Sequence, residues 1–343
     1  SGKTKYGEVI WDVVKKYVAD ALEANLDKQY WIVKPDTSIW EVHWDKRQHF
    51  FWTTAAAARG FCDLAAMSER HGKVEEAKKY ADLSGKIVKG IRNNFIDSKN
   101  VLAGSTEQLA KGKDYRDGAT VEAITWDIFK PTDPISIATL KDFSYLKTKL
   151  GGYKRLEGSN DPYDVNEWIM IDLRVADAFR RVGRTAEADA LIKWVTEQAT
   201  ANFNLLPELY DVYSTNGKYT GAIPMVGYGA GAYMMTLLER AGISEPRKCI
   251  GSKPPQKDMG VPAGDGPVTT VDLPYFPPEE GGVNPGVDSG TTGNNLEEAT
   301  GMACLCEAGV GAAGGVPSAD VIFIILLCLG AVVWRRRKSN HRA

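Results

Sequence analysis

The sequence is poor in the residues that build metal sites and disulfide frameworks. Its 343 residues include only four histidines and five cysteines. Neither set shows the paired spacing of a zinc site. The cysteines are odd in number and scattered over the chain, at Cys62, Cys249, Cys304, Cys306 and Cys328. We therefore expect no metal and no other cofactor.

An excess of charge of one sign is also lacking. The formal net charge is -2 at pH 7, with charged residues making up 25% of the chain. This balance gives no reason to expect nucleic acid as a partner. No apolar stretch after Ser1 has the character of a signal peptide. We expect that part of the protein lies upstream of residue 1.

Long alternating runs of β-branched residues are absent, so nothing in the sequence requires a strand. Instead, residues 6 to about 243 show the apolar repeat of helices, as in Val9, Val13, Tyr17 and Ala21. We predict an all-α region of stacked helical hairpins. The eight predicted helices cover residues 8–25, 49–71, 73–95, 120–129, 136–150, 166–182, 185–201 and 227–241.

Four long connections separate these helices. They cover residues 26–48, 97–119, 151–165 and 202–226. Loops of this length inside a compact domain are usually functional. If they gather at one end of a helical barrel, they form a pocket there.

The composition changes after residue 243. Residues 244–320 are rich in glycine and proline, which predicts a disordered, flexible linker. An apolar run from Val321 to Trp334 and a basic cluster follow, which define a third region, 321–338. A helix of this run is shorter than the roughly 30 Å hydrocarbon core. We nevertheless favour a short hydrophobic helix inserted in a membrane, with the basic end cytoplasmic, over a buried core helix.

The same tail resembles the C-terminal sorting tags of myxobacterial-type surface proteins. The matching parts are Cys304-Leu305-Cys306, the apolar run and the basic residues 335–338. The resemblance implies export and display at a bacterial cell surface, with the tag processed later. Two free thiols in a linker are the alternative for the cysteine pair.

Two glutamates lie in the long loops among groups that suit sugar chemistry. Glu41 lies between Trp40 and Trp44, whose indole faces can stack on sugar rings. Apolar surroundings favour the protonated form of a carboxyl, which a general acid needs in order to protonate a glycosidic oxygen. Glu208 lies in a later loop, where Tyr210 could orient it. A solvated surface glutamate is the alternative for each, unless the fold brings both loops together.

The segments around these glutamates resemble the two catalytic segments of glycoside hydrolase family 15. One is Ser38-Ile39-Trp40-Glu41 followed by His49-Phe50-Phe51, and the other is Pro207-Glu208 followed by Gly221-Ala222-Ile223-Pro224-Met225-Val226-Gly227-Tyr228. The family contains glucoamylases and related α-glucosidases and glucodextranases, and its catalytic domain is an (α/α)6 barrel of twelve helices. The resemblance covers about residues 6–243. It implies that region 1–243 is an incomplete barrel with about eight of the twelve helices.

The resemblance also implies an activity and a set of residues. The activity is inverting, exo-acting hydrolysis of α-glucosidic bonds, which releases glucose from the non-reducing ends of α-glucans or maltooligosaccharides. Glu41 is implied as the general acid and Glu208 as the general base, with carboxyls roughly 6.5–9.5 Å apart. Arg155 is implied to grip sugar hydroxyls, and Trp168 and Trp40 to line the same pocket.

The chain departs from the family at two points. Val42 stands where fungal glucoamylases have a second acidic residue, and the early Arg-Asp pair that clamps the terminal sugar has no counterpart here. We therefore expect this chain alone to be weakly active or inactive. Two other functions stay open: a non-catalytic surface module that binds glycans or is structural, and a related helical-barrel trehalase or disaccharide phosphorylase.

Two further groups of charged residues have simple explanations. Asp114 and Asp117 fit a turn as well as they fit a cation or substrate site. Arg180, Arg181 and Arg184 fit a solvated helix end.

Overall fold

The structure, a computed structural model, describes residues 5–213 and 228–242. The predicted linker 244–320 and the hydrophobic tail 321–338 lie outside the described residues, and so does most of the second family segment, 221–228. Within the described stretches, no helix is both long enough and apolar enough to cross a membrane. The membrane and surface predictions rest on the tail and stay predictions.

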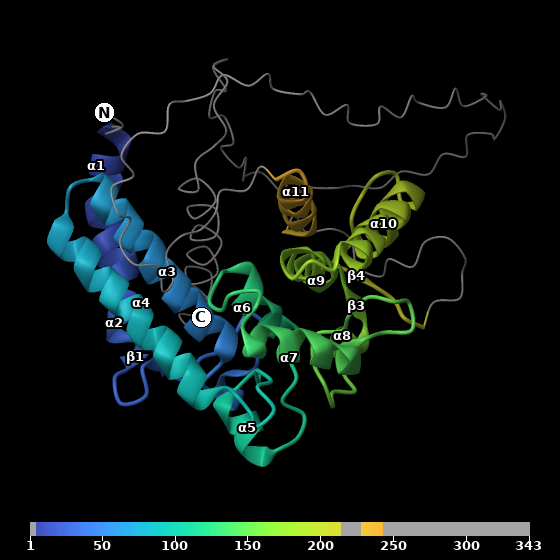
Figure 1. The fold of residues 1–343 in the computed structure, drawn as a ribbon. Helices are drawn as coiled ribbons and strands as arrows, with labels where there is room; N and C mark the ends of the chain where they lie inside the picture. The colour runs from blue at the N-terminus through green and yellow to red at the C-terminus, as the bar shows by residue number, and fades with distance from the viewer. Residues whose placement is uncertain (1–4, 214–227, 243–343) are drawn as a thin grey trace, which may run out of the picture. The chain divides into compact units, whose positions relative to one another are not determined.

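The described chain is helical, with a few very short strands, and its elements follow one another from α1 to α11 (Figure 1). Each of the eight predicted segments contains a helix. Seven of these segments are represented by α1 (Lys5–Val14), η1 (Lys15–Ala19), α2 (Asp20–Ala24), α3 (Phe51–Arg70), α4 (Val74–Asn94), α7 (Pro134–Asp142), α9 (Ile169–Arg181), α10 (Thr185–Ala201) and α11 (Tyr228–Arg240).

The remaining elements are short. Most of them lie in the connections, where we predicted none, and the others fall within the predicted helices 120–129, 136–150 and 166–182. The short helices are η2 (Trp44–Lys46), α5 (Thr106–Lys111), η3 (Gly118–Val121), α6 (Glu122–Thr125), η4 (Phe143–Leu146) and α8 (Pro162–Val165). The strands form two antiparallel pairs, β1 (Leu26–Asp27) with β2 (Ile32–Val33) and β3 (Glu167–Trp168) with β4 (Leu209–Tyr210). The second pair joins the start of the predicted helix 166–182 to the predicted loop 202–226.

The first predicted helix is interrupted, and its apolar stripe was predicted wrongly. Val13 and Tyr17 are exposed, whereas Trp11 and Val14 are buried in the core. The segment Lys15–Ala19 is a π-helix. A π-turn takes more residues than an α-turn and so shifts the face that follows. This shift affects Tyr17, which lies in the π-helix, whereas Val13 lies before it in α1 and was placed on the wrong face of an ordinary α-helix.

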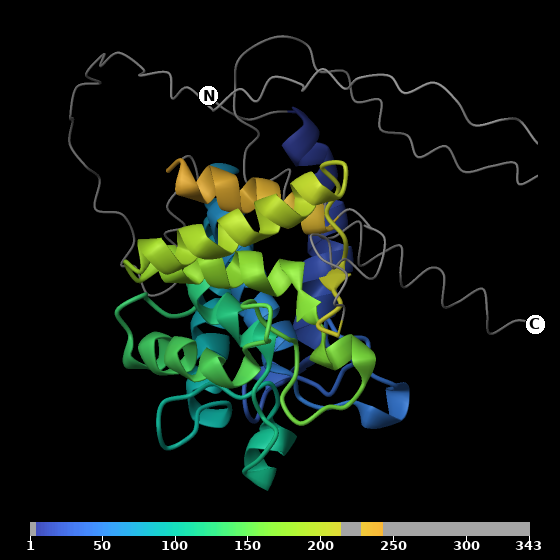
Figure 2. The same ribbon diagram turned by 90° about the vertical axis from the view of Figure 1, so that its right-hand side faces the viewer.

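Helical hairpins dominate the packing, as predicted. Helix α3 packs along α4, and Gly72 between them has φ 68°, a left-handed conformation that suits glycine. Helix α9 contacts both α10 and α11, and Figure 2 shows these three helices side by side.

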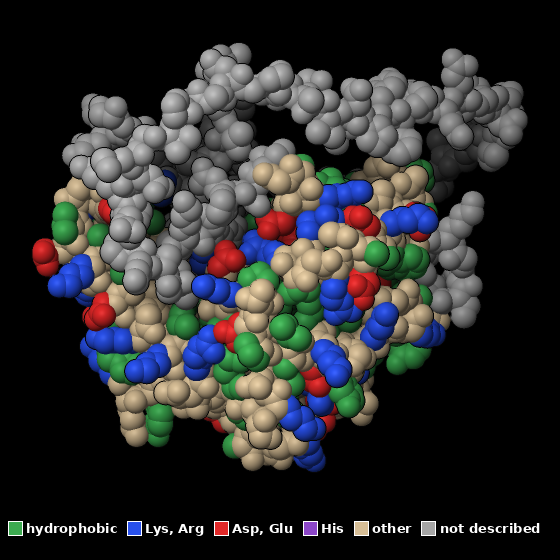
Figure 3. Space-filling view, in the orientation of Figure 1, with side chains coloured by type: hydrophobic (Ala, Val, Ile, Leu, Met, Phe, Trp, Pro, Cys, Tyr) green, Lys and Arg blue, Asp and Glu red, His purple; other side chains and the backbone are tan. Residues whose placement is uncertain are grey.

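Two large apolar clusters fill the interior. One lies between α3 and α4 and includes Phe51, Phe61 and Ile87. The other lies around α9 and includes Trp40 and Trp168, which we predicted as pocket residues. The surface contrasts with this interior. On the face shown in Figure 3, acidic and basic side chains are interspersed.

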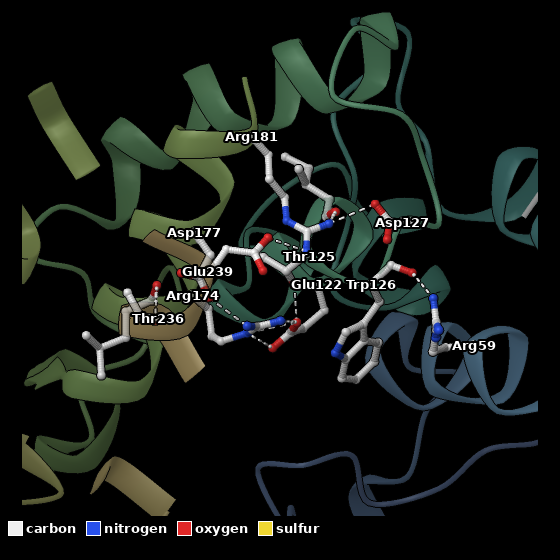
Figure 4. A network of polar contacts seen from close by, with 12 residues as sticks. Arg59, Glu122, Thr125, Trp126, Asp127, Arg174, Asp177, Arg181, Thr236 and Glu239 are labelled. Atoms are coloured by element: carbon white, nitrogen blue, oxygen red, sulfur yellow. Dashed lines mark hydrogen bonds and ion pairs between the residues drawn. The ribbon is translucent and has the colours of Figure 1, made fainter. Parts of the chain in front are cut away.

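A network of buried charges holds α9 in place (Figure 4). The Arg174 guanidinium is bonded to the Glu122 carboxylate of α6 at 2.8 Å and to the Asp177 carboxylate at 2.8 Å. Glu122 also accepts a hydrogen bond from the Thr125 hydroxyl. Burial raises the pKa of Asp177 to about 6, although Arg174 opposes this change. Helix α9 is thus fixed to α6 by directional bonds as well as by apolar contact.

The same network extends to α11 through Arg181. Its guanidinium forms ion pairs with Asp127 at 2.8 Å and with Glu239 at 2.6 Å (Figure 4). The prediction of a solvated helix end was therefore wrong for Arg181, whose side chain is largely buried. It holds for Arg184, which is exposed and pairs with the nearby Glu187. The partners of Arg181 are distant in the sequence, since Asp127 lies in the turn after α6 and Glu239 in α11, so local pattern did not predict them.

Candidate active site

The long loops of the chain are joined to one another by hydrogen bonds. The indole Nε1 of Trp40, in loop 26–48, donates to the carboxylate oxygens of Asp117, in loop 97–119, at 2.9 and 3.0 Å. Asp117 in turn forms an antiparallel bridge with Leu156, in loop 151–165. Three loops that are far apart in the sequence therefore meet at Asp117.

The fourth loop is joined through Glu208. The hydroxyl of Tyr163 donates to Glu208 Oε2 at 2.5 Å. The adjacent strand β4 pairs with β3, so that Trp168 lies opposite Leu209. The four long loops are thus linked within the described residues, with loop 202–226 represented by the part that ends at Tyr213.

A guanidinium surrounded by aromatic rings occupies this junction. The Cζ atom of Arg155 lies 5.2 Å from the ring centroid of Trp40, 5.3 Å from that of Tyr163 and 5.2 Å from that of Trp168. The ring of Trp168 lies edge-on to both other rings, with centroids 5.6 Å from Trp40 and 5.3 Å from Tyr163. Arg155 Nε also donates to Asp164. Because cations are attracted to aromatic faces, this arrangement holds Arg155 in one position.

Asp117 fixes Trp40, one member of this cluster. It is buried, and it accepts a hydrogen bond from the backbone N–H of Ala119 at 2.8 Å in addition to the two from Trp40. Burial raises the pKa of Asp117 to about 6, while these bonds and the nearby Arg155 oppose this change. The turn that we considered for Asp117 is present, but the residue also has a role between loops. In the described residues, no group of side chains fits a metal ion.

Glu41 follows Trp40 directly and lies in a strained turn. Its φ is 51° and that of Ser38 is 57°, in the left-handed region that side chains other than glycine disfavour. Such conformations cost about 1–3 kcal/mol and are concentrated at functional sites. Asp36 supports the turn, since its Oδ1 accepts bonds from Ser38 N at 2.6 Å and from the Thr53 hydroxyl at 2.9 Å.

The surroundings of Glu41 differ from those predicted. The side chain is exposed, and Trp44, the second expected wall, is 66% exposed. The other wall, Trp40, is buried and turned toward Asp117 and Arg155. The sequence predicted that both indoles lie beside the Glu41 carboxyl. In the structure, which has a turn at Ser38–Glu41, one indole is buried and the other is exposed.

Glu208 is half-buried and oriented by a different tyrosine from the one we predicted. Its bonded hydroxyl belongs to Tyr163, whose pKa is raised to about 12 by burial and by the bond to Glu208. Tyr210 is instead fully buried, and its ring packs edge-on against Trp194 with centroids 5.8 Å apart. Both side chains of the two-residue strand Leu209–Tyr210 are buried, so the Tyr210 ring packs in the core, and the hydroxyl bonded to Glu208 is that of Tyr163.

Two buried carboxyls support the loop that carries Arg155. Glu167 accepts a bond from Gly152 N at 2.8 Å, and Asp172 accepts one from Tyr153 N at 2.7 Å. Burial and the adjacent Glu167 raise the pKa of Asp172 well above its usual range. A Cβ at Gly152 would lie 2.3 Å from Asp172 Oδ1, so only glycine fits there.

The structure thus brings Trp40, Arg155 and Trp168 together as predicted, with Glu41 beside Trp40 and Glu208 attached through Tyr163. Sequence reasoning missed Tyr163, and it did not find the role of Asp117. The sequence feature that could have identified Tyr163 as a site residue is its position in a long loop, five residues before Trp168. An aromatic cluster with a fixed guanidinium and two loop carboxyls is suited to a polyhydroxylated ligand, because rings stack on its C–H faces and polar groups bind its hydroxyls.

No protein-family model matches the sequence. No curated protein matches it either. Solved structures do resemble it. A bacterial glucoamylase complexed with acarbose has a TM-score of 0.54 at 16% identity, over 70% of this chain and 39% of that one. The glycoside hydrolase family 15 glucoamylase from Hypocrea jecorina has a TM-score of 0.51 at 13% identity, over 70% and 48%.

A glucoamylase from Saccharomycopsis fibuligera has a TM-score of 0.50 at 12% identity, over 68% of this chain and 62% of that one. This chain therefore spans from about two fifths to just over three fifths of the length of these structures. At such low identity the likeness concerns the fold. The predicted fold class is confirmed: the described helices have the fold of part of a glucoamylase-like, all-α barrel domain.

Proposed function

We propose that this chain is part of a glycoside hydrolase that cleaves α-glucosidic bonds with inversion and releases glucose from the non-reducing ends of α-glucans. The observation that carries the proposal is the continuous connection from Glu41 to Glu208. It runs through Trp40, Asp117, Arg155 and Tyr163, on a glucoamylase-like fold. One such structure is a glucoamylase complexed with acarbose, which supports a sugar as the substrate class.

In the proposed reaction, Glu41 donates its proton to the glycosidic oxygen as the bond to the anomeric carbon breaks. Glu208 takes a proton from a water molecule, whose oxygen attacks the anomeric carbon from the opposite face. The water becomes the new hydroxyl of glucose, with inverted configuration. The hydrogen bond from Tyr163 orients the Glu208 carboxylate for this step.

Arg155, Trp40 and Trp168 are the proposed substrate-binding residues. The aromatic rings around Arg155 and its bond to Asp164 hold its guanidinium in place before a sugar arrives. A group that is already fixed loses less conformational entropy on binding. Trp40 and Trp168 are largely buried, so they act as the floor of the site more than as open stacking platforms.

The test is glucose release from maltooligosaccharides by the full-length protein, because this chain alone is expected to be weakly active or inactive, with the anomer identified by NMR as it forms. Glu41→Gln and Glu208→Gln should each reduce release by about 10²–10⁴-fold, the usual contribution of a general acid or base. Glu75→Gln, on the exposed surface of α4, is the matched control and should leave the rate unchanged. Full activity in either of the first two variants would contradict the assignment.

A non-catalytic glycan-binding module is the second candidate, favoured by the exposure of Glu41 and by the partial span of the glucoamylase fold. Binding of maltooligosaccharides without glucose release would support it. Display at a bacterial surface is likewise proposed from the tail from Val321 to Trp334, and fractionation of cells that produce the full chain tests it.

A further inference from the structure

A surface hollow lies beside the loop that carries Glu41. It has a volume of about 490 Å³, within the usual range of about 300–1,000 Å³ for ligand sites. It opens broadly to solvent and combines one aromatic ring with several polar groups. The lining residues are Asn25, Lys34, Pro35, Trp44, Asp45 and Arg47.

The aromatic ring of this hollow is held in place although it is exposed. Trp44 is 66% exposed, which is unusual for so large an apolar side chain. The guanidinium of Arg47 lies 3.9 Å from its ring centroid, and Arg47 Nε donates to the Trp44 carbonyl oxygen at 3.0 Å. Arg47 therefore covers part of one face of the indole and restricts its rotation, while much of the ring stays open to solvent.

Lys34, another lining residue, is fixed by hydrogen bonds of its backbone and its side chain. Lys34 N donates to Asn25 O at 2.9 Å, next to the pairing of β1 with β2. The Lys34 ammonium donates to Ala24 O at 2.9 Å, which holds this long side chain across the end of α2. The polar groups of the hollow thus have defined positions before any ligand binds.

This set of groups matches the chemistry of a neutral sugar. An open indole face receives the C–H face of a pyranose ring, and the amide, ammonium, guanidinium and carboxylate groups bind its hydroxyls. The two cations are partly balanced by Asp45, which disfavours a polyanion. Trp44 does not belong to the aromatic cluster around Arg155, so the hollow is separate from that cluster.

We propose that this hollow is an accessory binding site for a neutral α-glucan segment, in addition to the proposed catalytic pair. The choice of an α-glucan as ligand rests on the proposed function. The placement of the site rests on Trp44 and its neighbours alone. Binding there would keep a long glucan chain near the loop that presents Glu41.

The test is affinity electrophoresis of the full chain in gels containing glycogen, with glucose release from maltotriose measured in parallel. Trp44→Ala should weaken the apparent affinity for glycogen roughly tenfold, which corresponds to ~1.4 kcal/mol. Trp44→Phe, which keeps an aromatic face, should retain most of the affinity. Tyr145→Ala is the matched control, because Tyr145 is also exposed and also lies under an arginine, Arg116, at 3.9 Å.

The outcomes separate this inference from the proposed function. Loss of glycogen affinity in Trp44→Ala supports the accessory site, whether or not the chain releases glucose. Unchanged affinity in Trp44→Ala overturns it, even if glucose release proves the catalytic assignment. Stronger retardation by a polyanionic glycan than by glycogen also overturns it, because the ligand would then be recognised by charge.

Discussion

The hairpin of α3 and α4 and the surroundings of α9 are built by different interactions. Between α3 and α4 the contacts are mostly apolar, with Phe61 and Ile87 fully buried. Helix α9 instead buries three charged side chains among its apolar ones, Asp172, Arg174 and Asp177. Two neighbouring parts of one all-α fold thus use apolar packing in one case and directional bonds in the other.

The difference concerns how accurately each part is positioned. Apolar contact depends on area and shape and tolerates small shifts. Hydrogen-bonded ion pairs require particular distances and directions. Helix α9 begins directly after Trp168, and its Asp172 holds the loop of Arg155. The directional bonds are therefore found where the candidate site needs fixed geometry.

The largest expected effect comes from breaking the buried network. Arg174→Met leaves the Glu122 and Asp177 carboxyls buried without their cation, so the free energy of unfolding should fall by about 3–5 kcal/mol. Urea denaturation measures it. Arg184→Met removes an exposed pair and should cost less than about 1 kcal/mol. Equal losses of stability in the two variants would contradict the conclusion that the buried ion pairs of Arg174 matter more for stability than the exposed pair of Arg184.

A smaller effect concerns pH. The pKa of Asp117 is about 6 in the folded protein against an ordinary value of 3.8. Between about pH 4 and pH 6 the unfolded chain releases a proton that the folded chain keeps, so this residue makes folding less favourable as pH rises. The stability of wild type minus that of Asp117→Asn should fall by up to about 3 kcal/mol over this window.

Urea denaturation at closely spaced pH values tests this expectation. Asp45→Asn, in an exposed position, is the control and should show no such trend. A difference between wild type and Asp117→Asn that does not vary with pH would show that the folded protein does not hold the proton.

The smallest effect on the free energy of unfolding is expected in the apolar hairpin of α3 and α4. Ile87→Val removes one methylene from a fully buried position between α3 and α4 and should cost about 0.5–1.5 kcal/mol. This loss should be the same at pH 4 and pH 7, since no ionisable group is involved. A marked change with pH would mean that the hairpin also depends on the charges around α9.

The sequence predicted most of what depends on local pattern. The eight helices follow from the apolar repeat and from breaks at residues such as Gly72 and Gly183, both of which have positive φ. The exceptions also have local causes. The π-helix at Lys15–Ala19 interrupts the period of the first predicted helix at Tyr17, although it does not account for the exposed Val13 before it, and helices as short as Pro162–Val165 do not show a period.

The candidate site was predicted only in part, because its bonds join distant residues. The partners Trp40 and Asp117 are 77 positions apart, and Tyr163 and Glu208 are 45 apart. No spacing rule connects such pairs. The family resemblance pointed to Trp40, Arg155 and Trp168, whose side chains do lie together. The apolar surroundings expected for Glu41 were inferred from its sequence neighbours Trp40 and Trp44, of which one is buried and the other exposed.

The bonds that join the four loops also limit how the chain can vary in length. Surface loops generally accept insertions, because their backbone has few partners. Here an added residue in loop 97–119 would displace Asp117 and with it Trp40 and the loop of Arg155. Loop 151–165 is constrained in the same way at both of its ends. We therefore expect length changes in this chain to be tolerated in the connection between α3 and α4, at Gly72, and not in these loops.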